Sequence, residues 1–324
     1  MAAASPSAPA PRPRESLRDA YGETLVALGE ADPTLVVLDA DLSGSTRTQM
    51  FGKRFPERFF NVGVMEPTMM TVAAGLALGG RTVFASTFAV FAAGQAYNQV
   101  RQAICYNRAN VKIVATHGGL LVGPDGGTHQ MLEDVGLMRG LPRMAVAVPA
   151  DAPTTRAAVR AAAALDGPVY LRLPRENLPT VTDGAFAFGV APRLRDGSDL
   201  AIVAHGALLA RALETADELA RSGISVRVLD LASVKPVDSA ALLAAARQTG
   251  ALLVLEEHTV ETGIGALVAA TVAEGYPVPV RRVGVPDVFG ESGEAWAVLD
   301  RFGLSRERIR DEAWELLAQR GKVH

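Results

Sequence analysis

The segment from Ala115 to Asp134, ATHGGLLVGPDGGTHQMLED, combines reactive side chains with a backbone that can come close to a ligand. Its glycines permit that approach, while His117, Asp125 and His129 can bind hydroxyl groups and transfer protons near neutral pH. Two of the chain's five histidines stand here beside an acid. We therefore predict a ligand-binding loop, in preference to a surface loop with incidental histidines.

A metal site is the competing interpretation of the same loop, because histidine and aspartate are common ligands. The loop has no His-x-x-x-His pair and no cysteine partner, and its glycines would hold such ligands poorly. This spacing weakly disfavours a metal, and we predict none on this chain.

A second candidate is Glu66 in the segment NVGVMEPTMMTVAAGLALGG, between an apolar strand-like run and an apolar helix. Pro67 disfavours the α conformation at the residue before it and suits the first helical position, so Glu66 should lie at the helix start. An acid there is often only a cap. However, Met65, Met69 and Met70 indicate apolar surroundings, in which a carboxylate needs a partner.

The elements that position these residues indicate an α/β fold, because short Val, Ile and Leu runs alternate with amphipathic stretches. Five or six parallel strands and several helices are expected in the first half. The strands are predicted at 35–38, 82–85, 111–115, 145–148 and 169–173, and the helices from Leu17 behind Ser16 and at 67–78, 90–107, 129–139 and 152–165.

The second half repeats this alternation, so we predict two domains, each a mostly parallel sheet flanked by helices. Its strands are expected at 200–204, 226–229, 252–256 and 280–285. The predicted parts are a disordered, Ala/Pro/Ser-rich leader at 1–14, a first domain at 15–182, a Gly/Pro-rich linker at 183–198 and a second domain at 199–324.

Composition excludes several classes of function. A net charge of -3 without basic clusters argues against nucleic acid as a partner. The only cysteine, Cys105, excludes a disulfide framework and favours a reduced, cytoplasmic location. Every apolar run is broken well short of the roughly 20 residues needed to span a bilayer.

Two motifs resemble the transketolase family: THGGLLVGPDGGTHQ, followed by LEDVGLMRGLP and VPAD, and VGVME, followed by a helix ending AAGLALGG. The similarity covers about residues 15–320 and corresponds to the two C-terminal domains, especially to the C-terminal subunits of transketolases split into two polypeptides. It implies a pyrimidine-binding domain, a C-terminal domain and thiamin diphosphate as cofactor.

The resemblance assigns roles to several residues. Glu66 matches the acid that binds a ring nitrogen of the aminopyrimidine and so promotes loss of the thiazolium proton. Phe88 and Phe91, in STFAVFAAGQAYNQVRQAI, match the aromatic wall of the pyrimidine pocket. Without the motif, both phenylalanines would be interpreted as core. His117 and His129 would contact the donor's carbonyl and hydroxyl groups and relay protons.

Further residues would complete the site. Asp125 would hold a hydroxyl that distinguishes sugar stereochemistry, and Asp41, in LDADLSGST, matches an acid close to the cofactor. Arg18, Ser45 and Arg175 match the positions that bind sugar phosphate, for which a guanidinium is suited. The alternative for such an arginine is a solvated or paired surface charge.

The chain departs from the family pattern at Pro67 and Thr68, where Gln or His and then Asn are frequent, and at Gly94, where many members have a third aromatic. The first change could alter subunit contacts or donor choice, and the second leaves part of the pocket wall open. His205 and His258 are interpreted as structural, because the C-terminal domain of the family lies away from the chemistry.

The chain lacks the Gly-Asp-Gly motif and paired asparagines with which thiamin enzymes bind the metal and the diphosphate. The resemblance therefore implies a partner subunit that holds Mg²⁺ (or Ca²⁺) and the diphosphate, with a shared active site and an α2β2 assembly. Such an enzyme moves a two-carbon ketol unit from a ketose to an aldehyde.

Two other functions stay open. The beta subunit of a 2-oxoacid dehydrogenase shares the domain order and the glutamate, but DGGTHQ favours the sugar enzyme. A non-catalytic scaffolding subunit is disfavoured because Glu66, Asp125 and both loop histidines are present. The donor, the acceptor, their phosphorylation and the pathway cannot be assigned from these residues.

Overall fold

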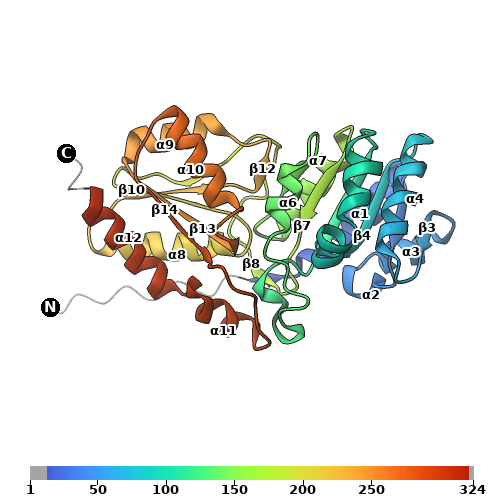
Figure 1. The fold of residues 1–324 in the computed structure, drawn as a ribbon, viewed down its shortest axis with the longest axis horizontal. Helices are drawn as coiled ribbons and strands as arrows, with labels where there is room; N and C mark the ends of the chain where they lie inside the picture. The colour runs from blue at the N-terminus through green and yellow to red at the C-terminus, as the bar shows by residue number, and fades with distance from the viewer. Residues whose placement is uncertain (1–12, 321–324) are drawn as a thin grey trace.

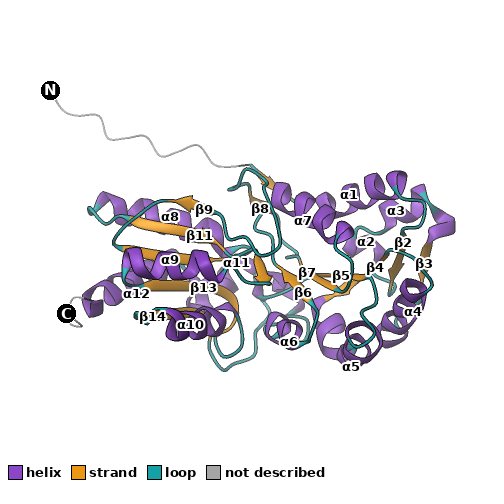
Figure 2. Cartoon of the chain, turned by 90° about the horizontal axis from the view of Figure 1, so that it is seen from above, coloured by secondary structure: helices purple, strands orange, loops and turns teal. Residues whose placement is uncertain are grey.

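The computed structural model describes residues 13–320, which form two large sheets lying side by side, each with helices on both faces, and a small two-stranded sheet (Figure 1, Figure 2). The first sheet has the strand order β12-β6-β7-β5-β4-β2-β3. Its strands are β2 (Val36–Asp39), β3 (Phe59–Asn61), β4 (Val83–Phe88), β5 (Val111–Thr116), β6 (Ala145–Ala147), β7 (Val169–Arg172) and β12 (Ser233–Lys235). All pair in parallel except β12, which is antiparallel to β6.

The predicted strands of the first half are confirmed, but the sequence analysis missed β3 and did not anticipate β12. β12 belongs to the second half of the chain and adds an edge strand to the first sheet. The two halves are therefore joined by backbone pairing as well as by side-chain contacts.

Helices cover both faces of this sheet (Figure 2). One layer contains α1 (Leu17–Ala31), α2 (Ser43–Thr46), α3 (Gln49–Arg54) and α7 (Ala152–Ala164), with η1 (Pro56–Arg58) nearby, and the other contains α4 (Glu66–Leu78), α5 (Tyr97–Gln99) and α6 (Asp134–Gly140). The predicted cap of α1 is confirmed, since the Ser16 side chain accepts a hydrogen bond from the Asp19 N–H.

Two predicted helices differ from the structure. The helix expected at 90–107 is a series of short pieces in which π-helical η2 (Val90–Gln95) and η3 (Val100–Cys105) flank α5. The helix expected at 129–139 begins only at Asp134, because residues 126–133 complete the glycine-rich loop. That loop contains the 3₁₀ helix η4 (Leu120–Asp125).

The second sheet has the order β14-β13-β10-β11-β9, and only β9 is antiparallel to its neighbour. Its elements are β9 (Arg193–Arg195), β10 (Leu200–Ala204), β11 (Val226–Asp230), β13 (Leu252–Thr259), β14 (Val280–Val285), α8 (Leu208–Arg221), α9 (Ser239–Thr249), α10 (Ile264–Gly275), α11 (Ala295–Leu299), η5 (Asp300–Leu304) and α12 (Arg306–Arg320). β9 lies inside the predicted linker and contributes to the second sheet.

The central strands are buried on both faces, as expected for parallel strands rich in Val, Leu and Ile. Each of the two hydrophobic core clusters contains residues from both halves of the chain. The halves therefore share continuous apolar packing.

At the N-terminus, β1 (Arg14–Glu15) pairs with β8 (Leu178–Pro179), so the predicted leader already ends before Arg14, and its residues 1–12 lie outside the described part. Within 13–320, no helix combines the length and apolarity needed to cross a bilayer.

Candidate active site

Glu66 is the first residue of α4 and is only 1% exposed. Thr87 Oγ1 donates to Glu66 Oε1 over 3.4 Å, while Oε2 is buried without a hydrogen-bond partner among the described residues. A buried carboxylate oxygen without a partner is costly. Since Glu66 does not cap its own helix through a side-chain hydrogen bond, its free oxygen is suited to bind a group from outside this chain.

Four rings gather where β4 and β5 end. Phe88 stacks on Phe91 with centroids 5.9 Å apart and on His117 at 3.8 Å. His129 meets Phe88 edge-on at 6.5 Å and Phe91 at 5.8 Å. The structure thus brings together the four aromatic residues that the sequence proposed separately, although Phe88 is largely buried.

His117 is held in an unusual backbone conformation, with φ +59° and its Nδ1 2.9 Å from Thr116 Oγ1. Burial, together with the positive charges of Arg18 and Arg175, lowers its pKa to about 3. The imidazole is therefore neutral at physiological pH and can accept a hydrogen bond.

Arg18, Ser45, Asp125 and Arg175 form a connected polar group beside the rings. Arg18 donates to the backbone oxygens of Ser45 and Arg175, each over 2.9 Å. Arg175 donates to the Val122 carbonyl at 2.7 Å and lies 3.7 Å from Asp125 Oδ1. Ser45 contributes its carbonyl rather than its hydroxyl to these contacts. Burial lowers the pKa of Arg18, with the neighbouring Arg47 charge acting in the same direction.

Asp41 lies apart from this polar group. It has φ +64° and exchanges hydrogen bonds with Asn61, whose side-chain oxygen also accepts the Gly63 N–H. Through Asn61, the hydrogen bonds of Asp41 thus link it to the segment that precedes Glu66. Among the described residues, none of its hydrogen bonds joins it to the histidines.

The departures from the family pattern lie on the surface. Gly94 and Thr68 are exposed, and a Cβ at Gly94 would meet no atom within 4 Å. Gly94 therefore contributes no side chain at the position where the family pattern has a third aromatic.

The sequence analysis missed a contact between the loop and the second half. Glu257 Oε1, on β13, accepts the Leu121 N–H over 2.6 Å, and Gln130 Nε2 donates to the Glu291 carbonyl over 2.9 Å. The second half thus contacts the loop that carries His117 and His129, which the sequence analysis did not anticipate. The only signal in the sequence was the acid pair that ends an apolar run at Glu256 and Glu257.

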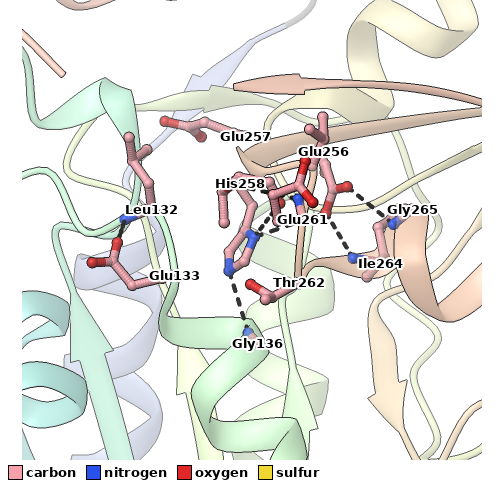
Figure 3. Close-up of polar contacts among 12 residues, drawn as sticks. Leu132, Glu133, Gly136, Glu256, Glu257, His258, Glu261, Thr262, Ile264 and Gly265 are labelled. Carbon is pink, nitrogen blue, oxygen red and sulfur yellow. Dashed lines mark hydrogen bonds and ion pairs between the residues drawn. The ribbon is translucent and has the colours of Figure 1, made fainter. Parts of the chain in front are cut away.

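His205 and His258, in the second half, are buried. His258 Nε2 accepts the Gly136 N–H over 3.2 Å (Figure 3), which agrees with a structural role. Neither ring nitrogen of His205 has a hydrogen-bond partner within residues 13–320. In the same range, no group of three or more His, Cys, Asp or Glu side chains is arranged to hold a metal ion.

Two models of known protein families match most of the described residues. The family model of the transketolase pyrimidine-binding domain matches residues 15–181, and that of the transketolase C-terminal domain matches 189–309. The chain is 40% identical over 302 residues to the 6-deoxy-6-sulfo-D-fructose transketolase subunit SqwH of Clostridium sp. strain MSTE9, covering 93% of this chain and 94% of that protein.

Two solved structures complete the comparison. One, described as a split gene transketolase, inactive beta4 tetramer, superposes with a TM-score of 0.88 at 50% identity, covering 94% of this chain and 98% of the other. The transketolase of Leishmania mexicana gives 0.82 at 27% identity, covering 96% of this chain but 47% of that one. The chain therefore belongs to the transketolase family and corresponds to the C-terminal section of a transketolase.

Proposed function

We propose that this chain is the C-terminal subunit of a split, thiamin-diphosphate-dependent transketolase, which transfers a two-carbon ketol unit from a ketose to an aldehyde. The observation that carries the proposal is the buried Glu66 carboxylate, whose Oε2 has no partner among the described residues. Phe88, Phe91 and the two loop histidines lie together beside the strand that follows α4.

The residues present fit the aminopyrimidine end of the cofactor. Glu66 Oε2 would share a proton with a ring nitrogen, and the planar faces of Phe88 and Phe91 would pack against the ring. When bound, thiamin diphosphate supplies the nucleophilic carbon that attacks the ketose carbonyl. Glu66 holds the proton that tunes this cofactor, and Asp41 is proposed to lie close to it.

The loop would bind the sugar. His117, neutral because its pKa is lowered, would accept a hydrogen bond from a hydroxyl of the ketose, and His129 packs edge-on against Phe91 beside it. Asp125 would bind a hydroxyl group and thereby discriminate between sugars. Arg175, together with Arg18 and Ser45, would bind an anionic group at the end of the sugar. This group could be a phosphate or the sulfo group in the name of the Clostridium relative.

The partner would be a transketolase N-terminal subunit that holds Mg²⁺ and the diphosphate, in an α2β2 assembly. Exposed apolar side chains directly precede Glu66 in the chain, with Val64 74% and Met65 53% exposed. Such a patch is typical of a protein interface. The similar split transketolase, described as an inactive beta4 tetramer, supports the idea that this section alone does not turn over.

Two other functions have less support from the structure. A 2-oxoacid dehydrogenase beta subunit would not need the Asp125–Arg175 pair, which supports binding of a hydroxylated, anionic sugar. A scaffolding subunit would not need to retain a buried, unpaired carboxylate such as Glu66.

The decisive experiment is reconstitution. The purified chain, a candidate diphosphate-binding subunit, and the two together are assayed with thiamin diphosphate, Mg²⁺, a panel of ketose donors and an aldehyde acceptor. Only the pair should transfer ketol units. Turnover by the single chain, or oxidative decarboxylation of pyruvate or branched-chain oxoacids by the pair, would overturn the proposal.

A further inference from the structure

A carboxylate of the second half caps a helix in the first half. η4 begins at Leu120, and no side chain of the loop itself caps it. The first N–H groups of a helix lack partners inside that helix. Glu257, on β13, fills this role, since its Oε1 accepts the Leu121 N–H over 2.6 Å. The contact is buried and joins residues 136 positions apart in the chain.

Two glycines make this contact possible. Gly119 has φ +83°, and a Cβ there would lie 2.4 Å from Glu257 Oε1. A Cβ on Gly118 would lie 2.3 Å from Arg172 Nε. Both distances are too short for real atoms, so the Gly-Gly pair directly after His117 is shaped to receive the Glu257 and Arg172 side chains.

Arg172 fixes the strand that carries Glu257. Its Nη2 donates to the Glu257 carbonyl over 2.9 Å, and its Nε lies 3.1 Å from Asp134 Oδ2. Tyr170 also donates to Asp134 over 2.8 Å. All these groups are almost completely buried, where hydrogen bonds and charges interact strongly. Glu257 is therefore held from two sides, by Arg172 at its backbone and by the loop at its side chain.

The adjacent residue provides a natural comparison. Glu256 points to the opposite side of β13, where it accepts the Ile264 and Gly265 N–H groups over 2.6 and 3.0 Å and caps α10 inside its own domain (Figure 3). Burial raises the pKa of both carboxyls to about 7. The two glutamates thus share strand, burial and capping role, but only Glu257 holds the loop.

We propose that Glu257 is a positioning residue through which the C-terminal domain fixes the loop that carries His117, Asp125 and His129. The inference rests on the proposed transketolase function for its catalytic consequence, but not for the contact itself. His117 lies three residues before η4 and Asp125 ends it, so we expect a change at the first turn of η4 to shift both side chains relative to a bound ketose. A displacement of about 1 Å can lower a rate about 100-fold.

The test compares three variants in the reconstituted pair: Glu257→Ala, Glu257→Gln and the control Glu256→Ala. Glu257→Ala removes the acceptor for Leu121 and should lower kcat/KM for the ketose about 10- to 100-fold, with the thiamin diphosphate concentration for half-activation unchanged. Glu257→Gln keeps an acceptor oxygen and should recover most of the activity. Glu256→Ala should lower thermal stability without this effect on the ketose.

A second measurement needs no turnover. Hydrogen–deuterium exchange of the isolated full chain follows peptides covering 118–129 and 264–275. Glu257→Ala should accelerate exchange in the first peptide and Glu256→Ala in the second. Equal exchange of 118–129 in the wild type and Glu257→Ala, or undiminished ketose turnover of Glu257→Ala, would overturn the inference. If the wild-type pair showed no ketose turnover, the proposed function would fail, and the exchange data alone would decide the positioning role.

Discussion

The ring of Phe88 stacks on the imidazole of His117, with centroids 3.8 Å apart and planes inclined by 23°. The two residues end neighbouring parallel strands, and the register pairs Phe88 with Thr116. The pair therefore lies at the carboxyl edge of the sheet, where open α/β sheets bind ligands. The proposed pyrimidine pocket contains Phe88, and the proposed sugar-binding loop begins with His117. Both can therefore share this edge of the sheet.

Glu66→Gln should lower the turnover of the reconstituted pair about 100-fold or more, since the amide cannot share a proton with a ring nitrogen. The isolated chain should unfold at the same or a higher temperature, because a neutral amide is cheaper to bury than a carboxylate whose Oε2 has no partner. Turnover and thermal unfolding are measured side by side. Glu57→Gln, an exposed acid on the preceding η1, is the control and should change neither. Full activity of Glu66→Gln would contradict the catalytic role.

His117 predicts a specific dependence of stability on pH. Burial lowers its pKa in the folded chain to about 3, from an ordinary value of 6.5. The unfolded chain therefore binds a proton below about pH 6.5 that the folded chain does not, so this residue destabilises the fold as pH falls from 6.5 toward 3. Between pH 7 and 5 the contribution is about 2 kcal/mol.

The measurement is urea unfolding of the wild type and His117→Asn at both pH values. Asparagine tolerates the positive φ of this position, so the variant should fold. Its free energy of unfolding should fall less between pH 7 and pH 5 than that of the wild type. An equal decrease in the free energy of unfolding of the two proteins would mean that the pKa of His117 is not lowered in the folded chain.

The sequence located the site residues because they stand where apolar runs end. Phe88 ends a buried strand, His117 directly follows another, and Pro67 marks the helix start at Glu66. The broken helix at 90–107 could not be foreseen, because no proline marks the positions of its π turns. Contacts between the halves could not be foreseen either, because local patterns carry no information on how two sheets dock. The hydrogen bond between Leu121 and Glu257 and the pairing of β12 with β6 are both contacts between the halves.

Asp125 should govern the choice of sugar and contribute little to stability. Its side chain is 37% exposed and lies 3.7 Å from Arg175 Nη1, so the pair is a surface ion pair worth less than about 1 kcal/mol. Asp125→Ala should leave the unfolding temperature unchanged and lower kcat/KM about 10-fold for ketoses that offer it a hydroxyl. Pairs of ketoses epimeric at one hydroxyl provide the assay. An equal loss for both epimers would exclude a role in stereochemical choice.

The exposed apolar face of α4 should be where the partner subunit docks. Val72 and Leu78, 41% and 63% exposed, are exposed apolar side chains of α4, which begins at the buried Glu66 directly after the exposed Val64 and Met65. A charge buried in such an interface without a partner costs about 2 kcal/mol or more. Val72→Asp should therefore raise the Kd of the pair at least about 30-fold, and it should leave the isolated chain folded because the side chain is partly exposed.

The control is Trp314→Asp. Trp314 is an apolar residue of similar exposure, 40%, on α12 at the opposite end of the molecule from α4 (Figure 1). Light scattering of each variant mixed with the partner gives the assembly, and ketol transfer gives the activity. Loss of assembly with Val72→Asp but not with Trp314→Asp assigns docking to the face beside Glu66. An active complex with Val72→Asp would mean that the partner completes the site from another side.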